Sequence, residues 1–344
     1  MTQAFRLLLT SVGGSMSGYT IQQFLNSTAH QVDVVGVDAR HDAVGKHFAT
    51  VFETVPPGDA PEYADAVFEI IRRHNVDLVL PCSDEETIAL SMHAEAVKAA
   101  GATLAISPPD AIEIMSDKLK TAKFLDRIGV PAPEWRLATS ENELFEALDE
   151  LRERHASLAV KPTQSRGSRD VYVIEKARTG YHQPSGHREC YLDIDTFKNL
   201  IDGPTDDAPL LVMQGLDAPA HDTDILCSNG KLLSAIPRLR HNKAGVPFTG
   251  GTIQNNADLI DIANKVTAGL NANWLFDIDT MSDEDGNPRV IEINCRPSGS
   301  LSAAAGAGAP ILDQLISLAK GEDIEQTELP DGRSIIPYST IKIV

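Results

Sequence analysis

The apolar and polar positions along the first hundred residues alternate between strand-length apolar runs and helical periods. The run VDVVGVDA is apolar on both faces, and the segment PEYADAVFEIIRRHN has the period of an amphipathic helix. Strands that are apolar on both faces are typical of a parallel sheet covered by helices. We therefore expect residues 1 to about 110 to form an open α/β domain. The expected elements are the strands 6–12, 32–39, 76–82 and 102–107 and the helices 19–26, 61–75 and 84–101.

Beyond residue 110 the chain loses this regular rhythm. The segment SDKLKTAKFLDRIGVPAP predicts a helix with the N-cap Ser116 and an end at Gly129, followed by two prolines, so we place a domain junction here. The dipeptide Asn229-Gly230 between two apolar runs predicts a hairpin turn. Further expected elements are a strand–loop–strand segment over 155–174, a short helix 193–201 within the irregular stretch 176–209, a strand 208–216, hairpin strands over 223–236 and a helix 258–272.

Two strand-like runs near the C-terminus, WLFDIDTM and RVIEINCR, are separated by SDEDGNP. The dipeptide at 285–286 is Asp-Gly, which favours a two-residue hairpin turn. With that turn, Asp279 lies opposite Glu292 and Asp277 lies opposite Asn294. The period of two along a strand places these polar side chains on one face of the hairpin.

Carboxylates directly opposite each other destabilise a sheet unless a cation lies between them. Carboxylate and amide oxygens are ligands that suit magnesium, and magnesium commonly completes its shell with water and substrate phosphates. We therefore expect Asp279, Glu292 and Asn294 to bind one or two Mg²⁺ or Mn²⁺ ions. The alternative is a solvated acidic hairpin, which is our expectation for the tip residues 283–285.

The composition is that of a globular protein with two or three packed units: 344 residues, 42% hydrophobic and 23% charged. A net charge of −19 disfavours nucleic acids and anionic membranes as partners. The chain has no apolar run long enough to cross a bilayer and no secretory signal, so we expect a cytoplasmic protein. Its four cysteines form no Cys-x-x-Cys pair, and we interpret Cys295 as a packed residue rather than a nucleophile.

A glycine-rich turn follows the first expected strand. Gly13, Gly14 and Gly18 form a G-G-x-x-x-G pattern instead of the G-x-G-x-x-G of dinucleotide-binding folds. We therefore favour a structural tight turn, with a dinucleotide site as the alternative. Asp38 at the end of the next strand suits either a cap or a ribose contact.

Several segments, in this order along the chain, together resemble an ATP-grasp protein of the carbamoyl-phosphate synthetase-like and biotin-carboxylase-like branch. They are the leading α/β domain, SDKLKTAKFLDRIGVPAP, LAVKPTQSRGSRDV, LLVMQGL and DIDTMSDEDGNPRVIEINCRPSGS. The resemblance implies an N-terminal pre-ATP-grasp domain with an open parallel sheet, followed by a two-lobed α+β ATP-grasp module. We divide the chain into this domain at 1–110, a small lobe at 111–212 and a C-terminal lobe with the metal site at 213–344.

The resemblance also implies roles for residues that match the family's motifs. Lys118 and Lys161 correspond to two lysines that hold the ATP phosphates. The loop that covers the phosphates corresponds to Gln164, Ser165, Arg166, Gly167 and Ser168. The hinge whose main chain reads adenine corresponds to Met213, Gln214, Gly215 and Leu216.

The metal ligands implied by the resemblance are again Asp279, Glu292 and Asn294. Arg296 and Arg238 resemble the arginines that hold the transferring phosphoryl group or the acidic substrate, a role that suits a planar guanidinium. Structural ion pairing is the alternative for Arg238. The hinge departs from the family at two points. Gly215 stands where a glutamate is usual, and no glutamate follows that could contact the ribose. Asp217 or His221 is the candidate for that ribose contact.

The function implied is an ATP-dependent ligase that joins a small carboxylate to an amine or similar nucleophile through an acyl phosphate, releasing ADP and phosphate. ATP and Mg²⁺ are the implied cofactors, and a homodimer is the family expectation. Two alternatives stay open at this point. One is an ATP-binding regulatory protein without turnover, and the other is an NAD(P)-dependent oxidoreductase that uses the glycine-rich turn.

Overall fold

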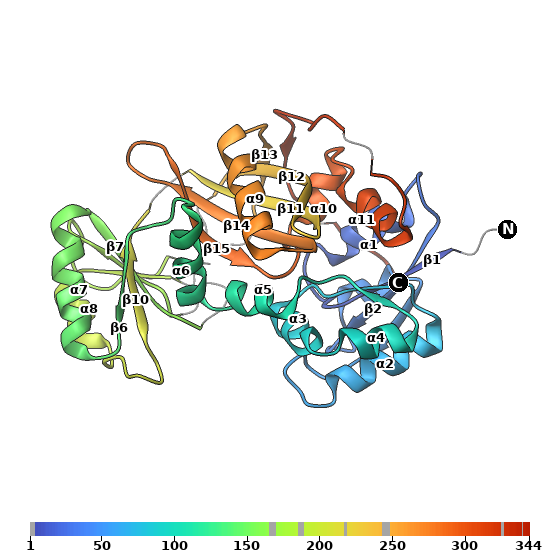
Figure 1. Cartoon of the computed structure of the whole chain (residues 1–344), viewed down its shortest axis with the longest axis horizontal. Coiled ribbons are helices and arrows are strands. Elements are labelled where there is room, and N and C mark those ends of the chain that lie inside the picture. The colour runs from blue at the N-terminus through green and yellow to red at the C-terminus, as the bar shows by residue number, and fades with distance from the viewer. Residues whose placement is uncertain are drawn as a thin grey trace.

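A computed structural model describes residues 4–164, 170–184, 189–216, 219–242, 248–324, 327–338 and 340–344. These residues form three sheets, one in each of three parts of the molecule (Figure 1). The N-terminal domain lies at the lower right of that view, the small lobe at the left and the C-terminal lobe above.

The N-terminal domain contains a parallel sheet with the strand order β3-β2-β1-β4-β5, which confirms the predicted open α/β domain. Its strands are β1 (Phe5–Leu9), β2 (Val32–Asp38), β3 (Val51–Thr54), β4 (Leu78–Leu80) and β5 (Thr103–Leu104). Its helices are α1 (Ser17–Leu25), η1 (Val44–His47), α2 (Tyr63–His74), α3 (Asp84–Ser91) and α4 (Ala94–Ala100). The sequence pattern did not reveal η1 and β3.

The single helix expected over 84–101 is wrong, because the structure breaks it into α3 and α4 at Met92 and His93. His93 leaves the helical conformation at φ −120° and ψ 15°, and its ring packs edge-on against Phe68 of α2. Packing against a neighbouring helix therefore interrupts a segment whose local pattern is continuous.

The glycine-rich turn is held by Asp38, whose Oδ2 accepts a hydrogen bond of 2.6 Å from the backbone N–H of Gly13. A Cβ at Gly13 would lie 2.8 Å from the same carboxylate oxygen, so the close approach needs glycine. Asp38 is thus engaged in the turn, in agreement with the structural reading of this motif.

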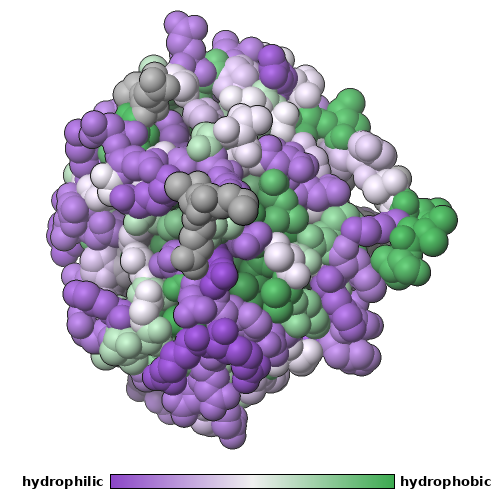
Figure 2. Space-filling model, turned by 90° about the vertical axis from the view of Figure 1, so that its right-hand side faces the viewer, coloured by the Kyte–Doolittle hydropathy of each residue, from purple (hydrophilic) through white to green (hydrophobic). Residues whose placement is uncertain are grey.

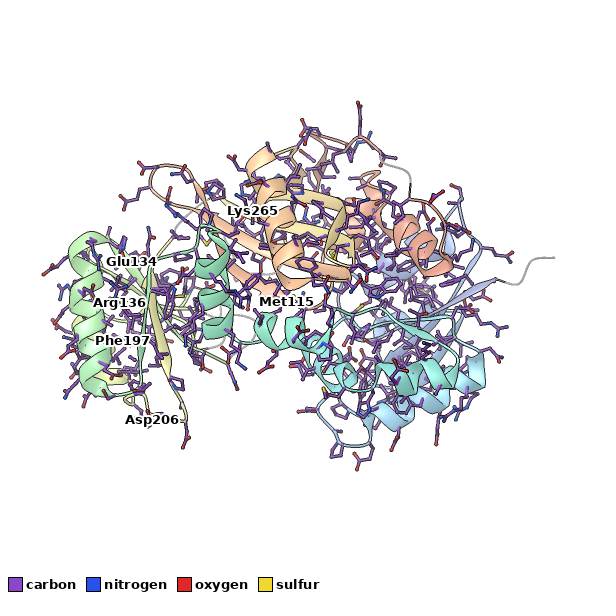
Figure 3. All side chains as sticks on the ribbon, viewed as in Figure 1. Met115, Glu134, Arg136, Phe197, Asp206 and Lys265 are labelled. Atoms are coloured by element: carbon purple, nitrogen blue, oxygen red, sulfur yellow. The ribbon has the colours of Figure 1, made fainter. Side chains whose placement is uncertain are left out.

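Two helices join the N-terminal domain to the small lobe: α5 (Pro109–Met115) and α6 (Lys118–Ile128). The predicted N-cap is wrong by one residue, because the Asp117 carboxylate, rather than Ser116, accepts a hydrogen bond from Lys120 N at 2.9 Å. The predicted end is confirmed, since Gly129 adopts a left-handed φ of 65°. Figure 3 shows Met115, the last residue of α5, near the middle of the molecule.

The small lobe has a sheet with the order β6-β10-β7-β8-β9 and its own hydrophobic core around Phe197 (Figure 3). Its elements are β6 (Trp135–Ala138), α7 (Glu141–Arg154), β7 (Ser157–Pro162), β8 (Tyr172–Glu175), β9 (Cys190–Leu192), α8 (Ile194–Leu200) and β10 (Leu210–Gln214). The boundary expected between residues 212 and 213 falls inside β10. The sheets themselves divide after Gln214.

The C-terminal lobe has a sheet with the order β15-β14-β11-β12-β13-β16. Its strands are β11 (Ala220–Ser228), β12 (Lys231–Arg240), β13 (Gly251–Ile253), β14 (Trp274–Ser282), β15 (Pro288–Asn294) and β16 (Ser334–Ile335). Its helices are α9 (Ala257–Leu270), α10 (Leu301–Gly306) and α11 (Ile311–Lys320). Asn229 and Gly230 both have positive φ between β11 and β12, which confirms the predicted hairpin turn.

The N-terminal domain and the C-terminal lobe share two hydrophobic clusters. One contains Val37 of β2 and Phe276 of β14, and the other contains Phe24 of α1 and Ile311 of α11. The end of the molecule at the right of Figure 1 is mainly hydrophilic, with hydrophobic side chains gathered near its centre and at one edge (Figure 2). No helix within the described ranges is long and apolar enough to span a membrane.

Candidate functional site

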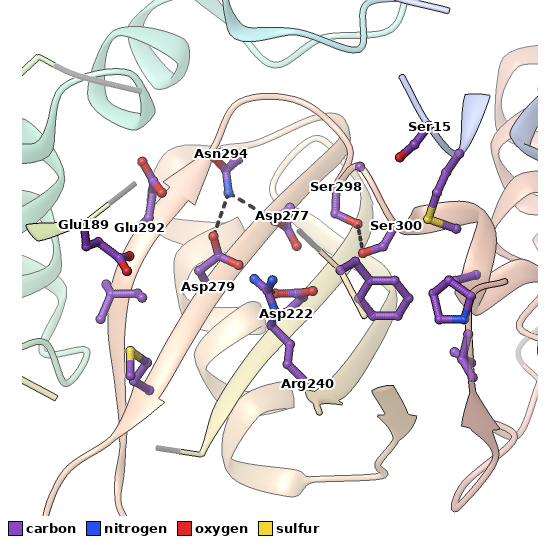
Figure 4. Close-up of a pocket in the computed structure, with 18 of the residues that line it drawn as sticks. Ser15, Glu189, Asp222, Arg240, Asp277, Asp279, Glu292, Asn294, Ser298 and Ser300 are labelled. Carbon is purple, nitrogen blue, oxygen red and sulfur yellow. Dashed lines mark hydrogen bonds and ion pairs between the residues drawn. The ribbon is translucent and has the colours of Figure 1, made fainter. Parts of the chain in front are cut away.

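A cavity of about 2270 Å³ lies between the small lobe, the C-terminal lobe and the N-terminal domain. Ligand pockets of about 300–1,000 Å³ are usual, so this cavity has room for a nucleotide and a second molecule. Figure 4 shows the part of the cavity floored by β14 and β15. Most of the residues that the sequence singled out line it: Lys118, Lys161, Met213, Gln214, Gly215, Leu216, Asp279, Glu292, Asn294 and Arg296.

The predicted register of the β14–β15 hairpin is confirmed at the site. Asp279 pairs with Glu292, and Asp277 pairs with Asn294. Asn294 donates hydrogen bonds from Nδ2 to Asp277 Oδ2 at 3.1 Å and to Asp279 Oδ2 at 3.2 Å (Figure 4). The four polar side chains therefore meet on one face of the sheet.

The turn that was used to derive this register is wrong. The backbone N–H of Asp283 donates to Asn287 O at 3.0 Å, so the loop holds three residues, 284–286, instead of two. Pairs near the loop are consequently shifted by one residue, as in Thr280 with Val290. A β-bulge that leaves Ile291 unpaired cancels the shift before the ladder reaches the polar residues.

The polar face extends across neighbouring strands. One row of paired positions contains Arg238, Asp222, Asp279 and Glu292 on β12, β11, β14 and β15. Sequence reasoning missed Asp222 and its neighbour Asp224 in the run HDTD. The signal was available, because polar residues two apart recur on all four strands, and that period is typical of one sheet face.

Asp277 and Asp279 on this face resist ionisation. Burial raises the pKa of Asp279 well above its ordinary value, and the charges of Asp277, Asp222 and Glu292 raise it further. Burial and the charges of Asp224 and Asp222 likewise raise the pKa of Asp277. A divalent cation would offset this repulsion and favour the charged carboxylates.

The residues present fit a magnesium ion. Asp277 Oδ1 is buried without a hydrogen-bond partner, and the neighbouring donors are carboxylate and amide oxygens, which hard cations prefer. In the described part of the chain, no three His, Cys, Asp or Glu side chains are grouped to hold a metal unaided. An ion here would therefore take part of its shell from Asn294, from water or from phosphate.

Two lysines stand beside these carboxylates. Lys118 Nζ lies 3.7 Å from Glu292 Oε1, and Lys161 Nζ donates to the carbonyl of the bulged Ile291 at 3.4 Å. Burial and the charge of Lys118 lower the pKa of Lys161 to about 8. A polyanion in the cavity would relieve the repulsion between these two ammonium groups.

Four residues of the expected phosphate-covering loop lie outside the described residues: Ser165, Arg166, Gly167 and Ser168. Asp217, a candidate for the ribose contact, also lies outside them. Gln164 is described, and its Nε2 donates to Asp117 Oδ2 at 3.2 Å.

The expected hinge, Met213 to Leu216, lines the cavity at the end of β10. The backbone N–H of Gly215 donates to Ser157 O at 2.8 Å. A Cβ at Gly215 would lie 2.4 Å from Ser157 Oγ and 2.7 Å from the carbonyl carbon of Ser157, so this close approach favours glycine.

Arg296 lines the cavity and is held by the N-terminal domain. Its Nε lies 3.5 Å from Oδ1 of Asp84, the first residue of α3, and its Nη2 donates to Asn294 Oδ1 at 3.4 Å. One guanidinium thus connects the N-terminal domain to the carboxylate face.

The structure does not bear out the ligand-binding role expected for Arg238. The side chain is fully buried and forms ion pairs with Asp224 at 2.7 Å and with Asp222 at 3.2 Å. It also donates to Ser300 Oγ at 2.7 Å. These contacts occupy the guanidinium, so the structural alternative is correct, and the neighbouring Arg240 is the one that lines the cavity.

His221, a candidate for the ribose contact, lies on β11 with its Nε2 2.9 Å from Gln254 Oε1. It is buried and outside the cavity lining. The structure therefore does not bring it to the cavity. Glu189 does line the cavity, and no motif in the sequence had indicated it.

Family models match both parts of this architecture. A model described as an ATP-grasp in the biosynthetic pathway with Ter operon matches residues 206–342, and a model of the PylC-like N-terminal domain matches residues 7–105. The C-terminal part of the chain thus matches the superfamily that the sequence motifs resemble. The whole chain is similar to carbamoyl-phosphate synthase from Methanobrevibacter smithii, with 25% identity over 88% of this chain and 81% of the relative.

Solved structures share this fold over nearly the whole chain. N5-carboxyaminoimidazole synthetase from Staphylococcus aureus with ADP matches with a TM-score of 0.67 and 14% identity, over 94% of this chain and 79% of that one. The biotin carboxylase domain dimer of 2-oxoglutarate carboxylase from Hydrogenobacter thermophilus was solved with MgADP and bicarbonate. It matches with a TM-score of 0.68 and 15% identity, over 96% of this chain and 73% of that one. The chain is therefore similar to proteins of the branch that the sequence motifs resemble.

Glu292→Gln removes a charge at the carboxylate face without changing side-chain volume. We expect an unchanged melting temperature and a loss of MgATP-dependent turnover of about 100-fold or more, because a hard cation loses a charged ligand. Asp285→Asn, which removes a carboxylate from the exposed loop of the same hairpin, is the control and should keep full activity. Full turnover in Glu292→Gln, measured as ADP release, would remove this residue from the metal site.

Lys161 should take up a proton when ATP binds. Its pKa of about 8 means that roughly half of the molecules lack the proton at pH 8, and neighbouring phosphates raise the pKa. Calorimetry with ATP and EDTA at pH 8, in buffers of different ionisation enthalpy, should give an uptake of about half a proton. The same uptake in Lys161→Gln would contradict this assignment.

Proposed function

We propose that this protein is a ligase that uses ATP to activate a small carboxylate as an acyl phosphate, which an amine or similar nucleophile then attacks. The observation that carries the proposal is the order of charged groups along one cavity. Lys161 and Lys118 come first, then the face of Asp279 and Glu292, and then Arg296. That order suits a nucleotide with its terminal phosphates toward Arg296.

In the first step, a carboxylate oxygen of the acceptor attacks the γ-phosphorus of ATP. The bond from this phosphorus to the β,γ-bridging oxygen breaks, and ADP leaves. In the second step the nucleophile attacks the acyl carbon, the bond from that carbon to the phosphate oxygen breaks, and phosphate leaves while the nucleophile loses its proton to water. ATP hydrolysis and amide formation are thereby coupled.

The residues act mainly by positioning and by charge. Lys118 and Lys161 would neutralise phosphate oxygens, and Arg296 would hold the transferring phosphoryl group with its planar guanidinium. Asp279, Glu292 and Asn294 would hold magnesium, which supplies further neutralisation of the phosphates when bound. The main chain of 213–216 would bind adenine.

The products test this mechanism. We expect ADP and phosphate in equal amounts, and release should need a carboxylate and a nucleophile together. Chromatography of the nucleotide products measures the outcome, and AMP with pyrophosphate would refute activation through an acyl phosphate. ATP binding with no turnover for any acid and nucleophile would favour the regulatory alternative.

Arg296→Lys keeps the positive charge but loses the bidentate guanidinium. We expect kcat to fall by about tenfold or more while the KM for ATP changes by less than about threefold, since the interaction matters most during transfer. A variant with the kcat of the unchanged protein would remove Arg296 from the mechanism.

Asp84 should act as a positioning residue for Arg296, because it lies 3.5 Å from the guanidinium and outside the cavity lining. We expect Asp84→Asn to lower kcat about three- to tenfold with an unchanged KM for ATP. The control is Asp65→Asn. Asp65 is exposed and Asp84 is half-buried, and both carboxylates lie in the first turn of a helix of the N-terminal domain. Equal effects of both substitutions would show a general loss of stability.

A further inference from the structure

Beyond Arg296 the cavity continues into an end that the nucleotide-binding motifs do not occupy. Segments far apart in sequence line it: residues 15–22, 44–48, 298–307 and, with residue 339 outside the described chain, 333–342. We name this region the acceptor end. In Figure 4 it begins at the right, beside Ser15 and Ser300, opposite Glu292 at the left.

Two aromatic rings form walls of the acceptor end, and each is seated against a glycine. A Cβ at Gly306 of α10 would lie 1.9 Å from Tyr19 Oη. A Cβ at Gly18 of α1 would lie 2.7 Å from the ring of Phe48. Neither glycine has a left-handed φ, so both positions require glycine for space rather than for conformation.

The basic groups of the acceptor end already have partners within the protein. Lys342 donates to His47 O, and its Nζ stands 3.9 Å from the centroid of the Phe48 ring. Arg333 Nη1 donates to Ala307 O at 2.8 Å. These contacts hold the C-terminal segment across this end of the cavity.

The described lining of the acceptor end contains no carboxylate, although the chain has 49 acidic and 30 basic residues. The acidic residues that line the cavity come from the small lobe and from β11, β14, β15 and their hairpin loop. An ammonium group on a molecule bound at the acceptor end would lose hydration without gaining an opposite charge.

We propose that the acceptor end binds a carboxylic acid with an apolar body of aromatic size and no ammonium group, its carboxylate directed toward Arg296. The proposal rests on the ligase function above and names the class of acid that is activated. The rings of Tyr19 and Phe48 contact the apolar body, and Met16 and Ala303 add to the same lining. Burial of apolar surface between aromatic walls supplies the affinity.

Four simple acids test the class by calorimetry on the protein loaded with MgADP. The reference is 3-phenylpropanoate; phenylalanine adds an ammonium, succinate replaces the ring with a second carboxylate, and propanoate lacks the ring. We expect 3-phenylpropanoate to bind at least about tenfold more tightly than each of the others. Tighter binding of phenylalanine or succinate, or no binding of 3-phenylpropanoate, overturns the proposal.

Hydroxylamine separates this inference from the ligase function, because it traps an acyl phosphate as a hydroxamate whatever the natural nucleophile is. If 3-phenylpropanoate binds most tightly but no hydroxamate forms, the ligase function is refuted and the proposed class of bound acid is kept. Hydroxamate formed mainly from succinate or phenylalanine would keep the function and overturn the class.

Gly306→Ala places a methyl group against Tyr19 and should push that ring into the acceptor end. We expect binding of 3-phenylpropanoate to weaken by about fivefold or more, with MgADP affinity within about twofold. Gly203→Ala, a remote glycine whose Cβ would lie 3.3 Å from the nearest atom, is the matched control.

Tyr19→Ala gives a second readout that does not depend on how α10 tolerates the methyl group, since Tyr19 is 42% exposed. We expect this variant to lose most of the preference for 3-phenylpropanoate over propanoate. Tyr19→Phe keeps the ring and should keep the preference. An unchanged preference in Tyr19→Ala would overturn the role of this aromatic wall.

Discussion

The repulsion among carboxylates on one face of the C-terminal sheet is the constraint on which the site depends. Asp222, Asp224, Asp277 and Asp279 lie on adjacent strands, with Glu292 at the edge of the row. Arg238 supplies a permanent counter-charge: burial alone would lower its pKa, but the charges of Asp224 and Asp222 raise it. That pairing lowers the pKa of Asp222 against the effect of burial, so Asp222 has a counter-charge inside the protein.

Asp277 and Asp279 form no such ion pair with a described residue. Asn294 donates its amide to Asp277 and Asp279, but an amide carries no charge, and both pKa values are raised. One acidic surface is therefore divided into a part paired with Arg238 and a part in which the pKa values of Asp277 and Asp279 are raised. The two arginines therefore differ in their surroundings. Arg238 is paired with aspartates inside the protein, whereas Arg296 contacts Asp84 and lines the cavity.

The hydrophobic cores connect the carboxylate face more closely to the N-terminal domain than to the small lobe. The N-terminal domain and the C-terminal lobe share two clusters, which fixes Asp84 against Arg296. The small lobe has a separate core and carries Lys161 and the hinge. The bond from Lys161 to Ile291 O joins the two lobes, and it exists because the bulge leaves that carbonyl unpaired with β14.

Local patterns in the sequence predicted the hairpin and the helix end at Gly129, because each depends on neighbours within a few residues. The repeated order of apolar strands and amphipathic helices predicted the N-terminal parallel sheet. They did not predict the bulge at Ile291, which compensates for a loop one residue longer than expected. They also could not separate Arg238, which lies within β12, from Arg296, which follows β15, because a local pattern does not show whether a side chain is buried. Arg238 is buried where β12 packs against the loop at Ser300. Arg296 instead reaches the cavity beside α3. Burial of a charged side chain is thus decided by distant segments, and it determines which charges remain available to a ligand.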